Sequence, residues 1–225
     1  MKNLFLFFFL LIASVAHSQK VLKGVVQNAE TGAPVPAASV FLNNTSVGTT
    51  ASADGRFTLS VPAGRYDLIV SSVGFETFTR TISSNTEEAL ITIKLQPKAK
   101  ELQTVVVAPF EKDGWQKWDK FFVESFIGLS AHAKDCDIKN SHVIKFRHDK
   151  KNNELSVVAL EPLIIENRAL GYTITYQLEH FSFSFKNNYL LYVGYPYLQP
   201  MKGGAARQRQ WAARRQQVYE GSMMH

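Results

Sequence analysis

The sequence predicts a mainly β protein, in which a seven-stranded β-sandwich is followed by a second, mostly antiparallel β region with one or two helices. The first observation is that apolar and polar side chains alternate over several short runs, as around Phe57, Leu59 and Val61, which is typical of strands with one buried face. The second is that turn residues such as Asp54-Gly55 separate these runs at short intervals. The third is that a hydrophobic content of 45% and a charged content of 20% are those of a globular protein.

The first eighteen residues have the plan of a secretory signal peptide. Lys2 precedes an apolar run from Leu4 to Ala13, and the small residues Ala16 and Ser18 end the segment. A run of about ten residues is too short for the roughly 20 that span a bilayer, which argues against an N-terminal membrane anchor. We therefore expect residues 1–18 to be removed and the mature chain, without a transmembrane span, to be exported to the periplasm, the outer membrane or the cell exterior.

Residues 20–97 are expected to form the sandwich. Tyr66, Leu68 and Val70 share one face of a run, as strand residues do when one face is buried. The ring of Tyr66 is expected to fill the core while its hydroxyl bonds nearby backbone. Breaks at Gly and Pro residues divide this stretch into seven strands, near residues 21–28, 38–43, 46–51, 56–61, 65–73, 76–82 and 89–95.

Several motifs occur in order along this stretch. They are Gly24-Val25-Val26, Thr31-Gly32-Ala33-Pro34-Val35-Pro36-Ala37-Ala38-Ser39-Val40, Asp54-Gly55-Arg56-Phe57, Val61-Pro62-Ala63-Gly64-Arg65-Tyr66 and Val73-Gly74-Phe75. This ordered set resembles carboxypeptidase regulatory-like domains. The resemblance implies a transthyretin-like sandwich of the prealbumin or immunoglobulin type, related in fold to some carbohydrate-binding modules and without an active site of its own.

Residues 98–107 are expected to be a polar linker that ends in a β-branched run. Its residues Leu102, Val105, Val106 and Val107 resemble the segment that follows the same domain in TonB-dependent outer-membrane receptors of Bacteroidota. An extended segment of this kind can add a strand to a sheet edge, so these four residues are a candidate partner strand for TonB. The alternative, which we favour, is that they begin the next domain.

Residues 108–225 predict a second β-rich region. Apolar residues at spacings of three and four between Asp113 and Ile127 predict a helix, and the tail from Ala205 to Tyr219 has the composition of another, packed through Trp211 and Val218. Hairpin turns are expected at 150–153 and 186–188. Between the helices, strand-like runs lie at residues 143–146, 155–159, 163–165, 172–178, 181–185 and 189–193.

This second region also carries a resemblance. Motifs such as Phe126-Ile127-Gly128 and Pro162-Leu163-Ile164-Ile165-Glu166-Asn167 are similar to the C-terminal part of secreted Bacteroidota proteins with a carboxypeptidase regulatory-like domain. That family has no assigned chemistry. Because the sequence ends at Met223-Met224-His225 without a charged fringe, we expect homologous chains to continue, which would make this one a fragment or a truncated gene product.

The charged and reactive residues give no pattern that predicts catalysis. The net charge of +6 comes from a basic tail rather than a basic face, which argues against nucleic-acid binding. The six histidines form no H-x-x-E or H-E-x-x-H pair, and no phosphate- or dinucleotide-binding glycine motif occurs, so we expect no metal, no cofactor and no catalytic residue. The single cysteine, Cys136, is read as a small buried residue, with an intermolecular bridge or reactive thiol as the alternative.

Together these observations favour a non-catalytic binding or structural module of the cell envelope that contacts proteins or glycans. Two alternatives stay open. One is a truncated or degenerate protein associated with TonB-dependent receptors, and the other is an unrecognised hydrolase in the second region, since active sites can be assembled from scattered residues.

Overall fold

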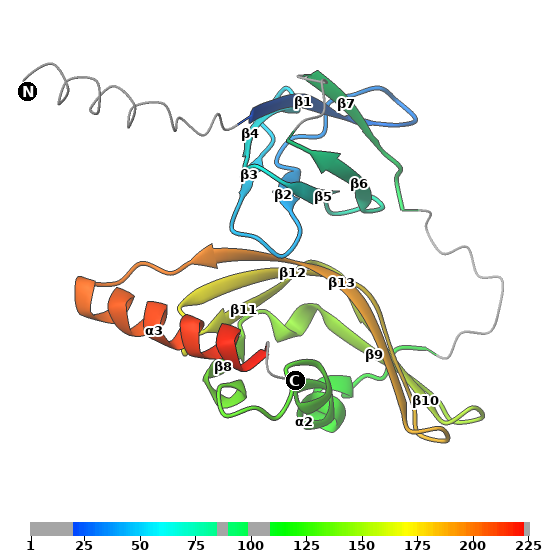
Figure 1. Cartoon of the computed structure of the whole chain (residues 1–225). Helices are drawn as coiled ribbons and strands as arrows, with labels where there is room; N and C mark the ends of the chain where they lie inside the picture. Colours follow the sequence, from blue (N-terminus) through cyan, green and yellow to red (C-terminus); the bar gives the residue numbers. More distant parts are fainter. Residues whose placement is uncertain (1–19, 85–89, 99–108, 223–225) are drawn as a thin grey trace, which may run out of the picture.

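A computed structural model of the chain describes residues 20–84, 90–98 and 109–222. They form a first unit of residues 20–98 and a second unit of residues 109–222, and the first unit lies over one face of the sheet of the second (Figure 1). The expected signal peptide and most of the expected linker fall outside the described residues. The predicted fold class is confirmed, because both units are built mainly from strands and two α-helices of the second unit are described.

Two sheets pack face to face in the first unit. Their strand orders are β4-β1-β7 and β3-β2-β5-β6, and every neighbouring pair is antiparallel except β1 with β7. All seven strands expected from the alternating pattern are confirmed, each within three residues of its predicted ends. They are β1 (Lys20–Asn28), β2 (Ser39–Leu42), β3 (Gly48–Thr50), β4 (Arg56–Val61), β5 (Arg65–Ser71), β6 (Phe78–Ser83) and β7 (Leu90–Leu95).

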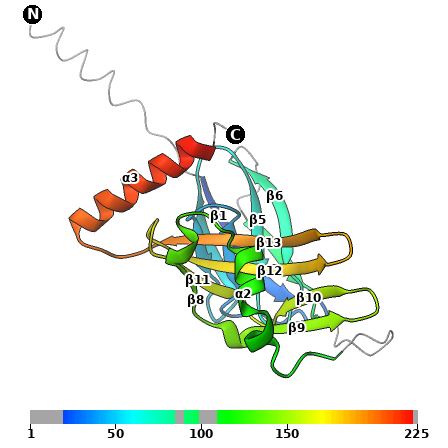
Figure 2. The same cartoon turned by 90° about the horizontal axis from the view of Figure 1, so that it is seen from below.

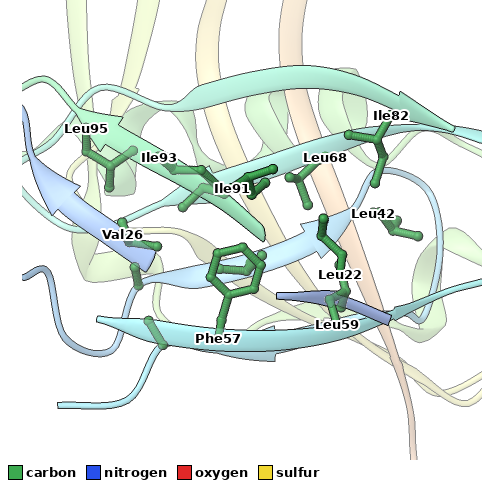
Figure 3. Packing of buried hydrophobic residues seen from close by; sticks show 14 of the residues in the cluster. Leu22, Val26, Leu42, Phe57, Leu59, Leu68, Ile82, Ile91, Ile93 and Leu95 are labelled. Carbon is green, nitrogen blue, oxygen red and sulfur yellow. The ribbon is translucent and has the colours of Figure 1, made fainter. Parts of the chain in front are cut away.

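The core of the first unit lies between these two sheets (Figure 3). Strand β4 shows how the sequence builds it, because Phe57, Leu59 and Val61 are buried while the residues between them are exposed. Burying each such side chain stabilises the fold by roughly 1.5–3 kcal/mol. Tyr66 behaves as expected: its ring packs against this core and its hydroxyl donates a hydrogen bond of 3.1 Å to the backbone oxygen of Ala63.

One antiparallel sheet of six strands forms the second unit. Its order is β8-β11-β12-β10-β9, and β13 lies along the other side of β12. Figure 2 shows β13, β12, β10 and β9 side by side, with helix α2 lying across the sheet. The elements are α2 (Gly114–Phe126), η1 (Ala133–Asp135), β8 (Cys136–Ile138), η2 (Ser141–Val143), β9 (Ile144–Asp149), β10 (Glu154–Ala159), β11 (Leu163–Asn167), β12 (Tyr172–Ser184), β13 (Tyr189–Pro200) and α3 (Ala205–Ser222).

Aromatic rings dominate the core between α2 and this sheet. Phe122 is fully buried, and its ring centroid lies 5.1 Å from that of Phe181, 5.2 Å from that of Phe126 and 5.9 Å from that of Phe146. Ring pairs at these separations add about 0.5–1.5 kcal/mol each beyond the burial of their area. The helix expected over residues 113–127 is therefore confirmed, and its apolar face is what fixes it on the sheet.

Glu111 ties the start of α2 in place. Its carboxylate accepts hydrogen bonds from Lys117 Nζ at 3.0 Å and from Trp118 Nε1 at 2.9 Å. Partial burial alone would raise the pKa of Glu111, but these two hydrogen bonds, together with the charges of Lys117 and His148, outweigh burial and hold the pKa below its usual range. The carboxylate consequently supports the fold at neutral pH and loses this contribution as the pH falls through its folded-state pKa.

Strand β12 differs from the expectation of two strands at 172–178 and 181–185. It is one strand of 13 residues, with a shift of register between Leu178 and His180 that leaves Glu179 as the extra residue of a β-bulge. The prediction was wrong here because the apolar face changes from even positions to odd ones at this point, which resembles a break between strands. The short strand β8 is not among the strand-like runs expected for this region, because three residues are too few to show a period.

The C-terminal helix α3 is held on the second unit by polar contacts. Trp211 is buried and its Nε1 donates a hydrogen bond of 3.0 Å to the backbone oxygen of Arg168, while Arg215 Nε donates one of 2.8 Å to that of Leu170. The guanidinium of Arg215 also lies 4.3 Å from the ring centre of Tyr172. The prediction that Val218 packs beside Trp211 was wrong, since Val218 is 40% exposed.

Candidate functional site

The loop between β2 and β3 joins the first unit to the edge of the second sheet. The backbone N–H of Asn44 donates a hydrogen bond of 3.2 Å to the oxygen of Pro196, and that of Leu198 donates one of 3.0 Å to the oxygen of Thr45. Both contacts lie on the outer side of β13, which its pairing with β12 leaves unoccupied. The loop thus uses the strand edge as a partner for its own backbone.

An aromatic pair lies beside these hydrogen bonds. The rings of Phe41 and Tyr197 stack with centroids 5.3 Å apart and planes inclined at 27°. Phe41 is only 2% exposed although its neighbours Val40 and Leu42, not Phe41 itself, belong to the core of the first unit. Gly48 permits this contact, because a Cβ at that position would lie 2.6 Å from the Tyr197 ring. The outer face of β2 is therefore buried by the second unit.

The β-bulge in β12 provides a third contact between the units. Glu179, the extra residue of the bulge, accepts a hydrogen bond of 2.5 Å from the hydroxyl of Thr77 through its Oε1 atom. Bulges change the direction of a side chain in this way without ending the strand. The two units are thus connected by a backbone pair, a ring stack and a side-chain hydrogen bond.

A cleft with a volume of about 330 Å³ lies where the two units meet. Three residues that carry hydroxyl groups, Ser39, Ser71 and Ser72, line it from the first unit, and Gln177, which carries an amide, lines it from β12. Ser71 is buried, with 6% of its surface exposed. These groups offer a ligand both donors and acceptors of hydrogen bonds.

Exposed apolar and charged side chains surround the polar part of the cleft. Val73 from the first unit is 68% exposed and Leu160 from the second is 55% exposed, and both line the opening. Lys98 and Glu161 add one charge of each sign. A ligand held here would meet hydrogen-bonding groups, several apolar side chains and no net charge, which suits neutral polar chains better than strongly charged ones.

The residues predicted as a partner strand are not part of this arrangement. Leu102, Val105, Val106 and Val107 lie in residues 99–108, outside the described residues. Sequence reasoning in turn missed the cleft, whose polar residues are scattered along the chain. One signal was present: Val40-Phe41-Leu42 and Leu68-Ile69-Val70 are apolar without alternation, which indicates strands buried on both faces. All six of these residues are buried.

Two titratable groups of the second unit have shifted pKa values. Burial, and to a smaller degree the charge of Asp135, raises the pKa of the Cys136 thiol, which is half-buried and free. Burial, with the nearby Tyr192, raises the pKa of Tyr176 to about 12. A raised thiol pKa means less thiolate at neutral pH, so Cys136 has the environment of a structural cysteine rather than a reactive one.

The described residues contain neither a metal-binding cluster nor a helix that could span a membrane. Within residues 20–84, 90–98 and 109–222, histidine, cysteine and acidic side chains nowhere gather in threes as a metal ion would require. None of the helices in these same ranges has the length and apolar character needed to cross a membrane.

Comparison with known proteins shows which domain family the first unit matches. Residues 22–107 match the CarboxypepD_reg-like domain family, which confirms the resemblance carried by the motifs. The TonB-dependent receptor P3 of Formosa agariphila is 31% identical over 104 residues, which are 46% of this chain and 10% of that receptor. The chain therefore spans only about a tenth of the length of this relative.

Solved structures from Bacteroides show weaker similarity over most of the chain. A DUF3823 family protein from Bacteroides ovatus is 12% identical, with 83% of each chain covered and a TM-score of 0.28. A candidate carbohydrate-binding protein from Bacteroides uniformis is 10% identical, with 78% of this chain and 77% of that one covered, also at a TM-score of 0.28. Scores this low do not establish a shared fold.

Proposed function

From the match of residues 22–107 to CarboxypepD_reg-like domains, we propose that this chain is a non-catalytic binding module of the bacterial cell envelope. It acts by contact with proteins or glycans, and its ligand is held in the cleft between the two units. Export follows from the signal peptide expected at residues 1–18.

The observation that carries the proposal is the composition of the cleft. Ser39, Ser71 and Ser72 come from the first unit, and Leu160 and Gln177 from the second, so neither unit forms the site alone. Ligand sites are preferentially found where domains meet, and 330 Å³ lies at the lower end of the roughly 300–1,000 Å³ of typical ligand clefts. Lys98 and Glu161 balance each other, which favours the hydroxyl groups of a neutral glycan or the backbone of an extended peptide.

Filling the cleft should weaken ligand binding. We expect Ser72→Trp to weaken the binding of a neutral oligosaccharide or peptide by about tenfold or more, because an indole would occupy the space of the ligand and displace its hydrogen-bonding partners. Isothermal titration calorimetry against a panel of neutral glycans and uncharged peptides measures the effect. Thr92→Trp is the matched control, since Thr92 is exposed on β7 and does not line the cleft.

Two results would count against the proposal. One is equal loss of affinity in both tryptophan variants, which would place the site elsewhere. The other is turnover of any member of the panel by the purified chain, which would replace a binding module with an enzyme.

A second candidate function rests on the similarity to the TonB-dependent receptor P3 of Formosa agariphila. If residues 102–107 engage TonB, Val106→Asp should abolish capture of the chain by an immobilised periplasmic domain of TonB, because a buried charge opposes strand addition. Thr104→Asp, which adds the same charge at a polar position of the same segment, is the control. Failure of the unsubstituted chain to bind TonB would exclude this function and leave the cleft proposal untouched.

A further inference from the structure

Strand β13 has an outer edge that the described residues cover over only half of its length. Its pairing with β12 occupies one side along the whole strand, and on the other side the loop of Asn44 and Thr45 covers the C-terminal half. Among the hydrogen bonds of the described residues, contacts to this outer side stop at Pro196. The N-terminal half is exposed, with Tyr189, Leu191, Tyr192 and Val193 between 41% and 60% accessible.

The backbone groups that this half presents follow from the contacts further along. Pro196 uses its oxygen and Leu198 its N–H toward the outer side. The backbone N–H and C=O groups of successive residues point to opposite sides of a strand. Because the bulge lies in β12 and not in β13, the backbone groups of all even-numbered residues of β13 point toward its outer side. The N–H and oxygen of Leu190, Tyr192 and Gly194 are thus available to pair with another strand.

This open half lacks the usual devices that prevent edge pairing. Monomeric proteins protect long edges with charged residues, prolines or bulges. No charged residue occurs in β13, whose sequence is Tyr-Leu-Leu-Tyr-Val-Gly-Tyr-Pro-Tyr-Leu-Gln-Pro, and Pro196 lies in the half that the first unit already covers. An exposed, apolar and uncharged edge of this kind indicates an interface.

The symmetry of the open stretch indicates which partner fits it. It runs from the turn at Asn188 to the covered position Pro196, and its central residue is Tyr192, whose backbone faces outward. An antiparallel pair centred there would place Tyr192 against Tyr192 of the second copy. It would also place Leu191 against Val193 and Tyr189 against Tyr195 on both sides of the centre.

In this register Leu190 lies against Gly194, and all the other pairs join apolar or aromatic side chains, which stabilise sheets when they meet across strands. We propose that the chain forms a two-fold symmetric dimer in which the open halves of two β13 strands pair antiparallel about Tyr192, joining the two sheets into one. The same patch serves both copies, as a two-fold interface requires.

Sedimentation velocity over a concentration series, on the chain expressed with its own leader, tests the proposal. We expect twice the mass of one chain, and we expect Leu191→Lys to weaken dimerisation by about tenfold or more, because the two-fold axis places two buried lysines in one interface. Val158→Lys is the matched control: Val158 is an exposed valine on β10, in the interior of the same sheet, and its substitution should leave the dimer intact.

Disulfide trapping tests the register independently of stability. In a Cys136→Ser background, Tyr192→Cys should form a covalent dimer, since residues opposite each other have Cα atoms about 5.5 Å apart, within reach of a disulfide. Leu191→Cys alone should not, because its neighbour across the axis is Val193; mixing it with Val193→Cys should restore the crosslink.

Three outcomes would overturn the proposal. They are a monomer at all concentrations, a dimer that Leu191→Lys does not weaken, and a crosslink that forms as well through Leu191→Cys alone as through Tyr192→Cys. If the monomeric chain instead binds a synthetic peptide that copies Tyr189–Gly194, the edge takes a separate polypeptide and the dimer is excluded.

Discussion

Phe122→Ala is expected to destabilise the second unit by about 3–5 kcal/mol. The ring is fully buried among Phe126, Phe146 and Phe181, so its removal leaves a cavity that rigid neighbouring rings cannot fill. Urea denaturation followed by tryptophan fluorescence measures the loss. All three tryptophans, Trp115, Trp118 and Trp211, lie in the second unit, so this signal reports on that unit alone.

The matched control for this change is Phe110→Ala. Phe110 is 38% exposed and its ring lies 4.1 Å from the guanidinium of Arg147, so its loss should cost about 1 kcal/mol, the value of a partly exposed cation–π contact. If Phe122→Ala and Phe110→Ala lowered the urea midpoint of the chain equally, the stability of the second unit would not depend on the aromatic core beneath α2.

Phe41→Ala is expected to weaken the contact between the two units as well as the fold. A fully buried phenylalanine costs about 3–5 kcal/mol when truncated, and here part of that cost belongs to the stack with Tyr197. A double-mutant cycle with Tyr197→Ala should give a coupling energy of about 0.5–1.5 kcal/mol. The free energies of unfolding come from urea titrations of the four proteins.

Phe78 provides the control pair. It packs against the core of the first unit from β6 and makes no ring contact with Tyr197 among the described residues. The cycle of Phe78→Ala with Tyr197→Ala should therefore be additive. If the effects of Phe41 and Tyr197 were additive too, the stacked rings would contribute nothing to holding the units together, and the backbone pair with the Thr77–Glu179 hydrogen bond would hold them instead.

The first unit could be predicted almost completely from the sequence. Alternation in β4 and β7, with turns such as Asp54-Gly55 between the strands, contains the information that a half-buried strand needs. The division of the chain into domains at residues 98–107 stays a prediction, because most of that stretch lies outside the described residues.

The cleft could not be predicted, because it depends on how two units meet. Ser71 and Gln177 are ordinary strand residues in their own sheets, and nothing in their neighbourhoods indicates that they line one space. The open edge of β13 could not be predicted either, for a different reason. The apolar run of residues 189–193 predicts a strand, but its pairing partners, and hence its open side, are a property of the assembled sheet.

The bulge at Glu179 determines which face of the sheet the side chains in the second half of β12 occupy. Ile174, Tyr176 and Leu178 face α2 before it, and Phe181, Phe183 and Phe185 face α2 after it. Because side chains alternate along a strand, deleting one residue there would turn the three phenylalanines inside out, from the core to the opposite face. The length of the chain at this point is thus a stricter requirement than the identity of the residue that occupies it.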